Sequence, residues 1–274
     1  MKEINAILTI AFRDLIKFLR DVPRIVATFV FPFVFIGILG GTLQSNLGQS
    51  AGYNLLLFVF TGVIGQTLFQ STASGIISLI EDKENDFSQE IFIAPVSRFS
   101  IIFGKILGES LVAFLQVLAI IIFGLIIGLP VTFIQVVSIL PVALIACLFG
   151  GAFGVLVLSN LSSQRSANQI FPFLIFPQFF LSGVFSPITH VSPLLFVLSR
   201  LVPMTYAVDL IRGIFYLGLP EYSKVVLHPP LVDLGVIAIF FAVFLTFSPQ
   251  SQDLLTPLIN FICLSHTFHF SVDI

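Results

Sequence analysis

Long runs of apolar residues constrain the fold of this chain more than any other feature of its sequence. Residues 106–129 form one such run, in which Glu109 is the only charged side chain. A helical run of about 20 apolar residues spans the hydrocarbon core of a bilayer, and these runs lack the alternation of a β-barrel strand. The chain is 57% hydrophobic but only 9% charged, whereas soluble domains carry about 25% charged residues. The sequence therefore predicts an all-α, polytopic membrane protein.

Six runs are long enough to cross a membrane. They are residues 25–43, 55–80, 104–128, 134–159, 168–186 and 231–248. Between the last two lies a segment of about 187–230, in which six prolines separate short apolar pieces. Such pieces can lie at membrane depth only where protein or water satisfies their backbone groups. These pieces could be re-entrant or interfacial helices.

The two ends of the chain differ in character from the spans. In residues 1–24, apolar side chains recur with helical periodicity opposite a basic face, which predicts an amphipathic helix lying in the membrane interface. A cleaved signal peptide fits poorly, because the apolar run that follows is too long. Residues 249–274 contain no Lys or Arg and only short apolar pieces, so no role is predicted for this tail.

Basic residues predict the orientation of the chain. The N-terminal segment holds five, the loop at about 81–105 holds three, and Arg165 lies in a further loop, whereas loops 44–54 and 129–133 hold none. Cytoplasmic loops carry the excess of Lys and Arg. Both termini and the 81–105 loop are therefore expected on the cytoplasmic side of a plasma membrane. The three remaining basic residues fall within 187–230.

Small and polar residues inside the spans suggest how the helices pack. Four G-x-x-x-G pairs allow close approach of helix backbones, either within the chain or, for one pair, between subunits. The pairs are Gly37/Gly41, Gly104/Gly108, Gly124/Gly128 and Gly150/Gly154. Four amides could line a substrate path or form interhelical hydrogen bonds. They are Gln66, Gln70, Gln116 and Gln178. Glu109 is the only acidic residue in the third to fifth spans, which argues against a proton-coupled carrier or pump.

Motifs of enzymes and nucleotide sites are absent. The sequence has no H-E-x-x-H or G-x-S-x-G motif. Its Gly104-Lys105 pair has Phe99 and Ile106 where a phosphate-binding loop requires Gly and Ser or Thr. We therefore expect no enzyme activity, no metal site and no cofactor bound by this chain. If transport uses ATP-Mg, a partner subunit must bind it.

The stretch "EDKENDFSQEIFIAPVSRFSIIFGK", residues 81–105, is the most charged part of the chain. An acidic cluster precedes a short amphipathic helix candidate that Pro95 would terminate. Phe87 and Ile91 lie among carboxylates in a loop that should face water. A plain solvated loop is one interpretation, but a short helix with both features also suits the groove of another protein.

This loop resembles the cytoplasmic loop of type-2 ABC transporter permeases. That family shows an acidic-basic-acidic run, a short helix, an Ala/Thr-Pro-x-Ser-Arg motif and a Gly-Lys pair at the start of the third span. Here these are Asp82-Lys83-Glu84, Ala94-Pro95-Val96-Ser97-Arg98 and Gly104-Lys105. "VPMTYAVDLIRGIFY", residues 202–216, is similar to the family's extracellular segment, and the resemblance extends over about residues 1–248. Asp86 stands where the family often has glycine.

The resemblance implies that residues 25–248 form a permease domain. It further implies a dimer of permeases that works with a separate ABC ATPase, exports an amphiphilic, drug-like or lipid-linked substrate as in multidrug efflux, and comes from a prokaryote. No nucleic acid would be bound. Residues of about 83–95 would form the coupling helix on the ATPase. The implied coupling residues are Lys83, Glu84, Asp86, Phe87, Glu90, Ile91, Pro95 and Arg98. The alternative is an ATP-independent secondary carrier or channel.

Overall fold

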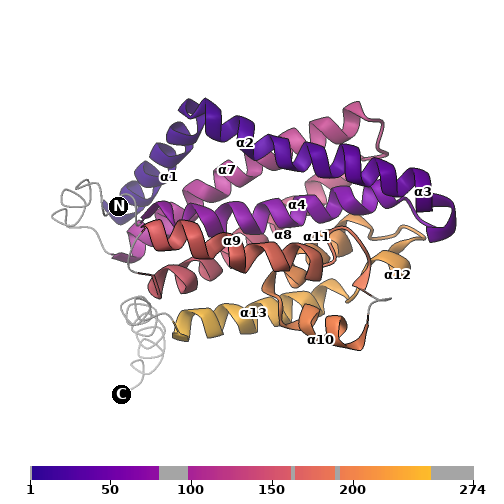
Figure 1. The fold of residues 1–274 in the computed structure, drawn as a ribbon. Helices are drawn as coiled ribbons and strands as arrows, with labels where there is room; N and C mark the ends of the chain where they lie inside the picture. Colours follow the sequence, from indigo (N-terminus) through magenta and orange to yellow (C-terminus); the bar gives the residue numbers. More distant parts are fainter. Residues whose placement is uncertain (1, 80–97, 162–163, 189–191, 248–274) are drawn as a thin grey trace, which may run out of the picture.

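The computed structural model describes residues 2–79, 98–161, 164–188 and 192–247, and every regular element in these ranges is helical. The elements are α1 (Lys2–Arg20), α2 (Val22–Phe33), η1 (Val34–Gly40), α3 (Gly41–Ala51), α4 (Leu55–Gly75), α7 (Arg98–Ile126), α8 (Phe133–Ser159), α9 (Gln164–Leu181), α10 (Pro193–Leu201), α11 (Pro203–Phe215), α12 (Tyr222–Val225) and α13 (Pro230–Phe247). Figure 1 shows the long helices running side by side, with α1 at one end of the bundle and α12 at the other.

Five helical stretches among the described residues are long and apolar enough to cross a membrane. They are Val22–Ala51, Leu55–Gly75, Ser100–Ile126, Phe133–Ser159 and Tyr222–Phe244. The pair α10 and α11, bent by 88°, would raise the number to six if it counts as one span. This confirms the predicted all-α, polytopic membrane fold.

The helix at the predicted fifth span differs from the expectation. Residues 168–186 were expected to cross the membrane, but α9 runs from Gln164 to Leu181 and is not among the five apolar stretches. Its first two turns are polar, and only residues 170–181 are mainly apolar. Twelve helical residues extend about 18 Å, which is less than the hydrocarbon core of about 30 Å. The α9 helix nevertheless runs along the bundle (Figure 1).

Helix α4 forms the centre of the bundle. It packs against α7, α8 and α11, and 89% of the residues in its 18-residue apolar stretch are buried. Between Leu57 and Ile64 its apolar side chains are buried on every side of the helix, which suits such a position. Close packing on α8 depends on Gly150 and Gly154, because a Cβ at Gly154 would lie 2.5 Å from the carbonyl oxygen of Ala73. This glycine pair therefore packs within the chain.

Helix α1 is amphipathic, as predicted, and it packs along α7. Gly104 and Gly108 make this contact possible, since an added Cβ would lie 3.1 Å from the Ile7 carbonyl oxygen and 3.1 Å from Ala11 Cα, respectively. This second glycine pair also packs within the chain. By contrast, Gly41 has no described atom within 4 Å of such a Cβ.

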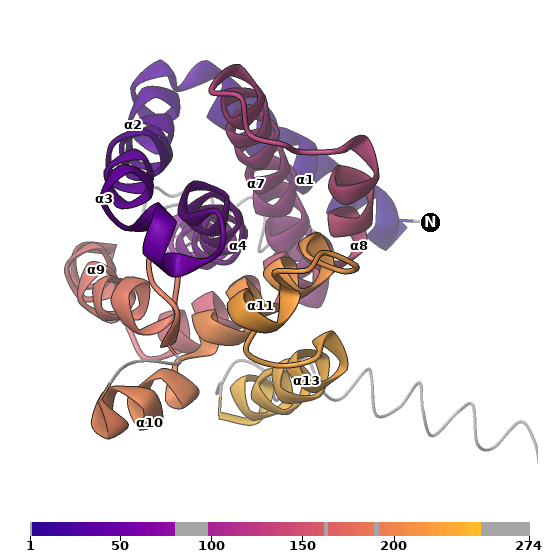
Figure 2. The ribbon, with the colours of Figure 1, turned by 90° about the vertical axis from the view of Figure 1, so that its right-hand side faces the viewer.

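Between α9 and α13 the chain folds back into the bundle. Pro193 and Pro203 begin α10 and α11, which suits proline because the first-turn N–H groups of a helix need no intrahelical partner. Nearly every residue of α11 is buried, whereas α10 exposes much of its apolar surface. Figure 2, viewed towards the α12 end, shows α11 between α4 and α13.

Candidate functional site

The residues proposed to couple to an ATPase fall almost entirely outside the described part of the chain. Lys83, Glu84, Asp86, Phe87, Glu90, Ile91 and Pro95 lie in the range 80–97, and Arg98 is the first residue of α7. The two helices that flank this range are α4 and α7, which pack against each other. The roles of these eight residues in coupling to an ATPase stay predictions.

Three of the four predicted amides meet in one cavity. Gln66, Gln70 and Gln116 line a space of about 280 Å³ between α2, α4 and α7. The other lining residues are Arg24, Ala27, Thr28, Phe31, Pro32, Thr67, Ser71 and Ser74. Gln66 Nε2 donates to Gln70 Oε1 at 3.0 Å, while the buried Oε1 of Gln66 accepts no hydrogen bond from a described residue. The cavity therefore offers amides, hydroxyls and one guanidinium to a bound molecule.

Gln178 does not line this cavity. It lies on α9, where its Nε2 donates to the carbonyl oxygen of Leu174 at 2.9 Å. This bond lies within one helix, and the buried Oε1 of Gln178 accepts no hydrogen bond from a described residue. The structure thus separates Gln178 from the amides with which it was grouped.

A network of ion pairs lies at the α1 end, beside the cavity. Arg24 Nη2 is 3.3 Å from Glu109 Oε2, and Glu109 is almost completely buried. Gly75 leaves room for this carboxylate, because an added Cβ would overlap with it. Asp14 pairs with Lys105 Nζ at 2.9 Å and with Arg13 at 3.0 Å. These pairs join α1, α2 and α7.

Most of this network could not be predicted from the sequence. Glu109 stood out as an acid within a span, but the partners of Lys105 and Asp14 depend on how α1 lies along α7. Asp14 falls on the face of α1 that packs against Gly108, whose added Cβ would lie 3.1 Å from Asp14 Cβ. Only the docked helices bring these charges together.

Arg212 fastens α11 to α4 at the other end of the bundle. Its guanidinium lies 3.7 Å above the Phe58 ring, and Nη2 donates to the carbonyl oxygens of Phe58 and Gly183 at 3.3 and 3.1 Å. An added Cβ at Gly62 would lie 2.8 Å from this group. Burial raises the pKa of the neighbouring Tyr216, while the positive charge of Arg212 acts in the opposite direction.

Asp209 orders the segment before α13. Its carboxylate accepts hydrogen bonds from the backbone N–H groups of Leu227, at 2.9 and 3.1 Å, and of His228, at 2.8 Å. Asp209, His228 and Asp233 bring potential metal ligands within 4.8 Å of one another. The sequence predicted no metal site and missed this cluster, because the three residues form no known ligand motif.

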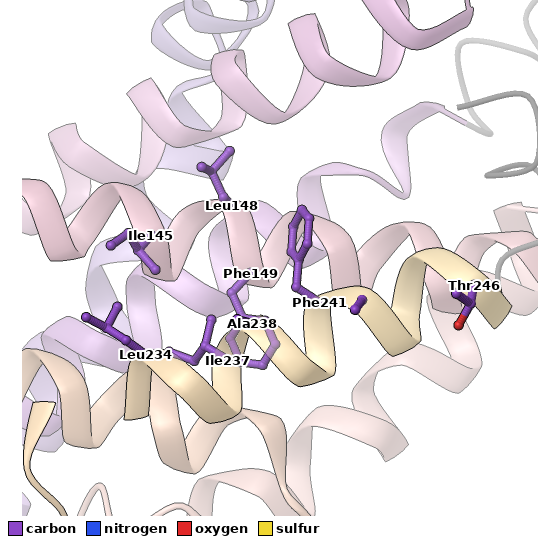
Figure 3. A pocket seen from close by; sticks show the side chains of 9 residues that line it. Ile145, Leu148, Phe149, Leu234, Ile237, Ala238, Phe241 and Thr246 are labelled. Carbon is purple, nitrogen blue, oxygen red and sulfur yellow. The ribbon is translucent and has the colours of Figure 1, made fainter. Parts of the chain in front are cut away.

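A second, apolar groove lies between α8 and α13 (Figure 3). It has a volume of about 490 Å³. Its lining residues are Ile145, Leu148, Phe149, Leu234, Ile237, Ala238, Phe241, Ala242 and Thr246. The hydroxyl of Thr246 already donates to the Val243 carbonyl oxygen at 2.9 Å. The groove therefore offers an occupant mainly apolar contacts.

Spanning helices packed round a polar cavity characterise membrane transport proteins. The model of the ABC-2 type transporter family matches residues 5–216, and the chain belongs to this family. A relative from Cyanophora paradoxa, named "Putative transport permease ycf38", is 25% identical over 220 residues, which cover 77% of this chain and 74% of the relative. The chain is thus a membrane permease of an ABC transporter.

Proposed function

We propose that this permease exports an amphiphilic substrate as a dimer, powered by a separate ATPase docked on residues 83–95. The packing of α4 on α7, the two helices that flank residues 80–97, is the observation that carries this proposal. A force applied to the loop acts on both helices together, and α4 contacts α8 and α11 as well. ATP-Mg binds in the ATPase, because the chain has no phosphate-binding loop.

The proposal places the α1 end of the bundle in the cytoplasm. Basic residues whose side chains are described lie on α1 and near the starts of α2, α7 and α9. They are Arg13, Lys17, Arg20, Arg24, Lys105 and Arg165. The rule that cytoplasmic loops are rich in Lys and Arg supports this orientation. The loop that meets the ATPase then lies on the side where ATP is available.

The polar cavity between α2, α4 and α7 is the proposed substrate path. Its volume of about 280 Å³ lies near the lower limit of ligand pockets, so it suits the polar part of an amphiphile. Pro32 lines the cavity, and the chain continues from it into η1, a stretch of π-helix. Such widened turns are frequent at functional sites.

Coupling requires that the loop interact differently with the open and the closed ATPase. We expect the double substitution Glu84→Ala/Phe87→Ala to lower the transport rate of the reconstituted complex at least tenfold, while ATP hydrolysis continues. Phe87 would supply the apolar anchor and Glu84 a polar contact at its rim. Lys224→Ala, at the opposite end of the bundle, is the control and should transport normally. Normal transport by the loop variant would contradict the assignment.

The same complex tests whether an ATPase is needed at all. The tagged chain, purified in mild detergent from its native membrane, should retain an ATPase at equal stoichiometry, and scrambling residues 83–95 should release it. If the chain alone transports substrate in liposomes, the function is that of a secondary carrier and the proposal fails.

The role of the cavity amides can be tested separately. We expect Gln70→Leu and Gln116→Leu each to lower kcat/KM for transport about tenfold, which corresponds to one lost hydrogen bond. Gln178→Leu removes a buried amide outside the cavity and should have a smaller effect. Equal losses in all three variants would show that these amides act through packing, not through the substrate.

A further inference from the structure

We propose that Asp209, His228 and Asp233 form a zinc site at the α12 end of the permease. Asp209 lies on α11, His228 just before α13, and Asp233 in the first turn of α13. Ligand atoms of all three side chains lie within 4.8 Å of one another. A bound ion would join the folded-back helix α11 to the last spanning helix.

Two of the three distances between ligand atoms fit tetrahedral coordination, and the third pair, Asp209 and Asp233, lies within 4.8 Å. His228 Nδ1 lies 3.4 Å from Asp209 Oδ2 and 3.3 Å from Asp233 Oδ1. Zinc binds imidazole nitrogen and carboxylate oxygen at about 2.0–2.1 Å, and the tetrahedral angle then separates two ligand atoms by about 3.3 Å. The two separations that involve His228 agree with this value.

Asp233 supplies a second, independent indication of a ligand. Its side chain is completely buried, and neither carboxylate oxygen accepts a hydrogen bond from a described residue. Burying a carboxylate is unfavourable, and the polar groups beside Asp233 are His228 Nδ1, 3.3 Å from its Oδ1, and the carboxyl group of Asp209. A cation held between the two carboxylates would satisfy both.

The surroundings suit a bound ion. Backbone N–H groups of Leu227 and His228 hold Asp209 in place, as second-layer contacts orient metal ligands elsewhere. The His228 side chain is 17% exposed, which leaves a route for entry. Arg200 Nη1 lies 3.4 Å from His228 Nδ1 and must withdraw when a cation binds. Its guanidinium also stacks 4.7 Å from the centre of the Phe196 ring, which gives it another contact.

The ligand set favours zinc over harder cations. Calcium takes six to eight oxygen ligands and magnesium keeps several waters, so neither matches one imidazole and two carboxylates. Imidazole suits zinc and its transition-metal neighbours. Three protein ligands leave the fourth tetrahedral position to water.

The test uses the full-length chain purified in detergent through a tag without histidine and then freed of metal with a chelator. We expect one zinc per chain by mass spectrometry of the metal, and a rise in Tm of about 5 °C at zinc concentrations a hundredfold above Kd. Magnesium at the same concentration should leave Tm unchanged. These readouts involve no transport, so they are independent of the proposed function.

Two conservative substitutions locate the ion. Asp233→Asn keeps the hydrogen bonds of Asp209, and both it and His228→Gln should lose the bound zinc and the rise in Tm. Glu221→Gln removes a nearby acid outside the cluster and should behave as the wild type. Zinc retained by both cluster variants would place the ion elsewhere, for example on His266 and His269, and would overturn the proposal. A wild-type chain that takes up no zinc would overturn it as well, whether or not the variants fold.

Discussion

Gly150→Ala will destabilise the permease by about 3 kcal/mol, because α8 meets the backbone of α4 at this residue. A Cβ there would overlap with the Phe69 carbonyl oxygen, and it would lie 2.5 Å from Thr72 Oγ1 and 2.8 Å from the Phe69 carbonyl carbon. The clash is with backbone atoms of Phe69, which cannot move away by a rotamer change as a flexible side chain can. Thermal unfolding in detergent, followed by size-exclusion chromatography, measures the loss.

Gly41→Ala is the matched control, since it places the same methyl group on another spanning helix. No described atom lies within 4 Å of the new Cβ, and alanine favours a helix interior over glycine by up to about 1 kcal/mol. The Tm of this variant should stay the same or rise. A Gly150→Ala variant as stable as Gly41→Ala would mean that α4 and α8 do not pack at this glycine.

Lys105→Met should cost about 3 kcal/mol of stability, because it leaves Asp14 buried with a smaller positive charge around it. Lys105 Nζ and Asp14 Oδ2 lie 2.9 Å apart, and each side chain is only 2% exposed. Breaking a buried ion pair costs about 3–5 kcal/mol, and we take the lower value because Arg13 still pairs with Asp14. Thermal unfolding again measures the effect.

The double variant Asp14→Leu/Lys105→Met separates charge from packing. Removing both charges should recover much of the stability, since a buried pair is often replaceable by apolar side chains. Arg20→Ala removes an exposed charge from the same helix and should change Tm by less than about 2 °C. If the double variant is less stable than Lys105→Met alone, the ion pair stabilises the fold by more than the neutralisation of two buried charges.

The number and order of most spanning helices could be predicted from the sequence, because a bilayer imposes one length on every apolar run. Residues 134–159 match α8 to within one residue, and residues 104–128 match α7 except that this helix begins six residues earlier, at Arg98. The fifth span, 168–186, matched less well, since apolar length alone did not weigh the polar start of α9 at Gln164.

The candidate sites were less predictable, because they depend on how helices turn towards one another. Polarity within apolar runs singled out Gln66, Gln70 and Gln116, which share a cavity, together with Gln178, which does not line it. Their role in a substrate path stays a prediction. Asp209 and His228 come from segments that meet only after α11 folds back beside α13. Tertiary proximity of that kind leaves no periodic signal along the chain.

The burial of α4 has a consequence for how fast the permease can respond to the proposed ATPase. Because α4 is surrounded by α7, α8 and α11, a shift of this helix along its axis displaces protein side chains and little lipid. Interior side chains are close-packed, so neighbouring rotamers must change in a concerted way. The resistance to such a shift would come from side-chain repacking within the protein, and membrane viscosity would contribute little to it.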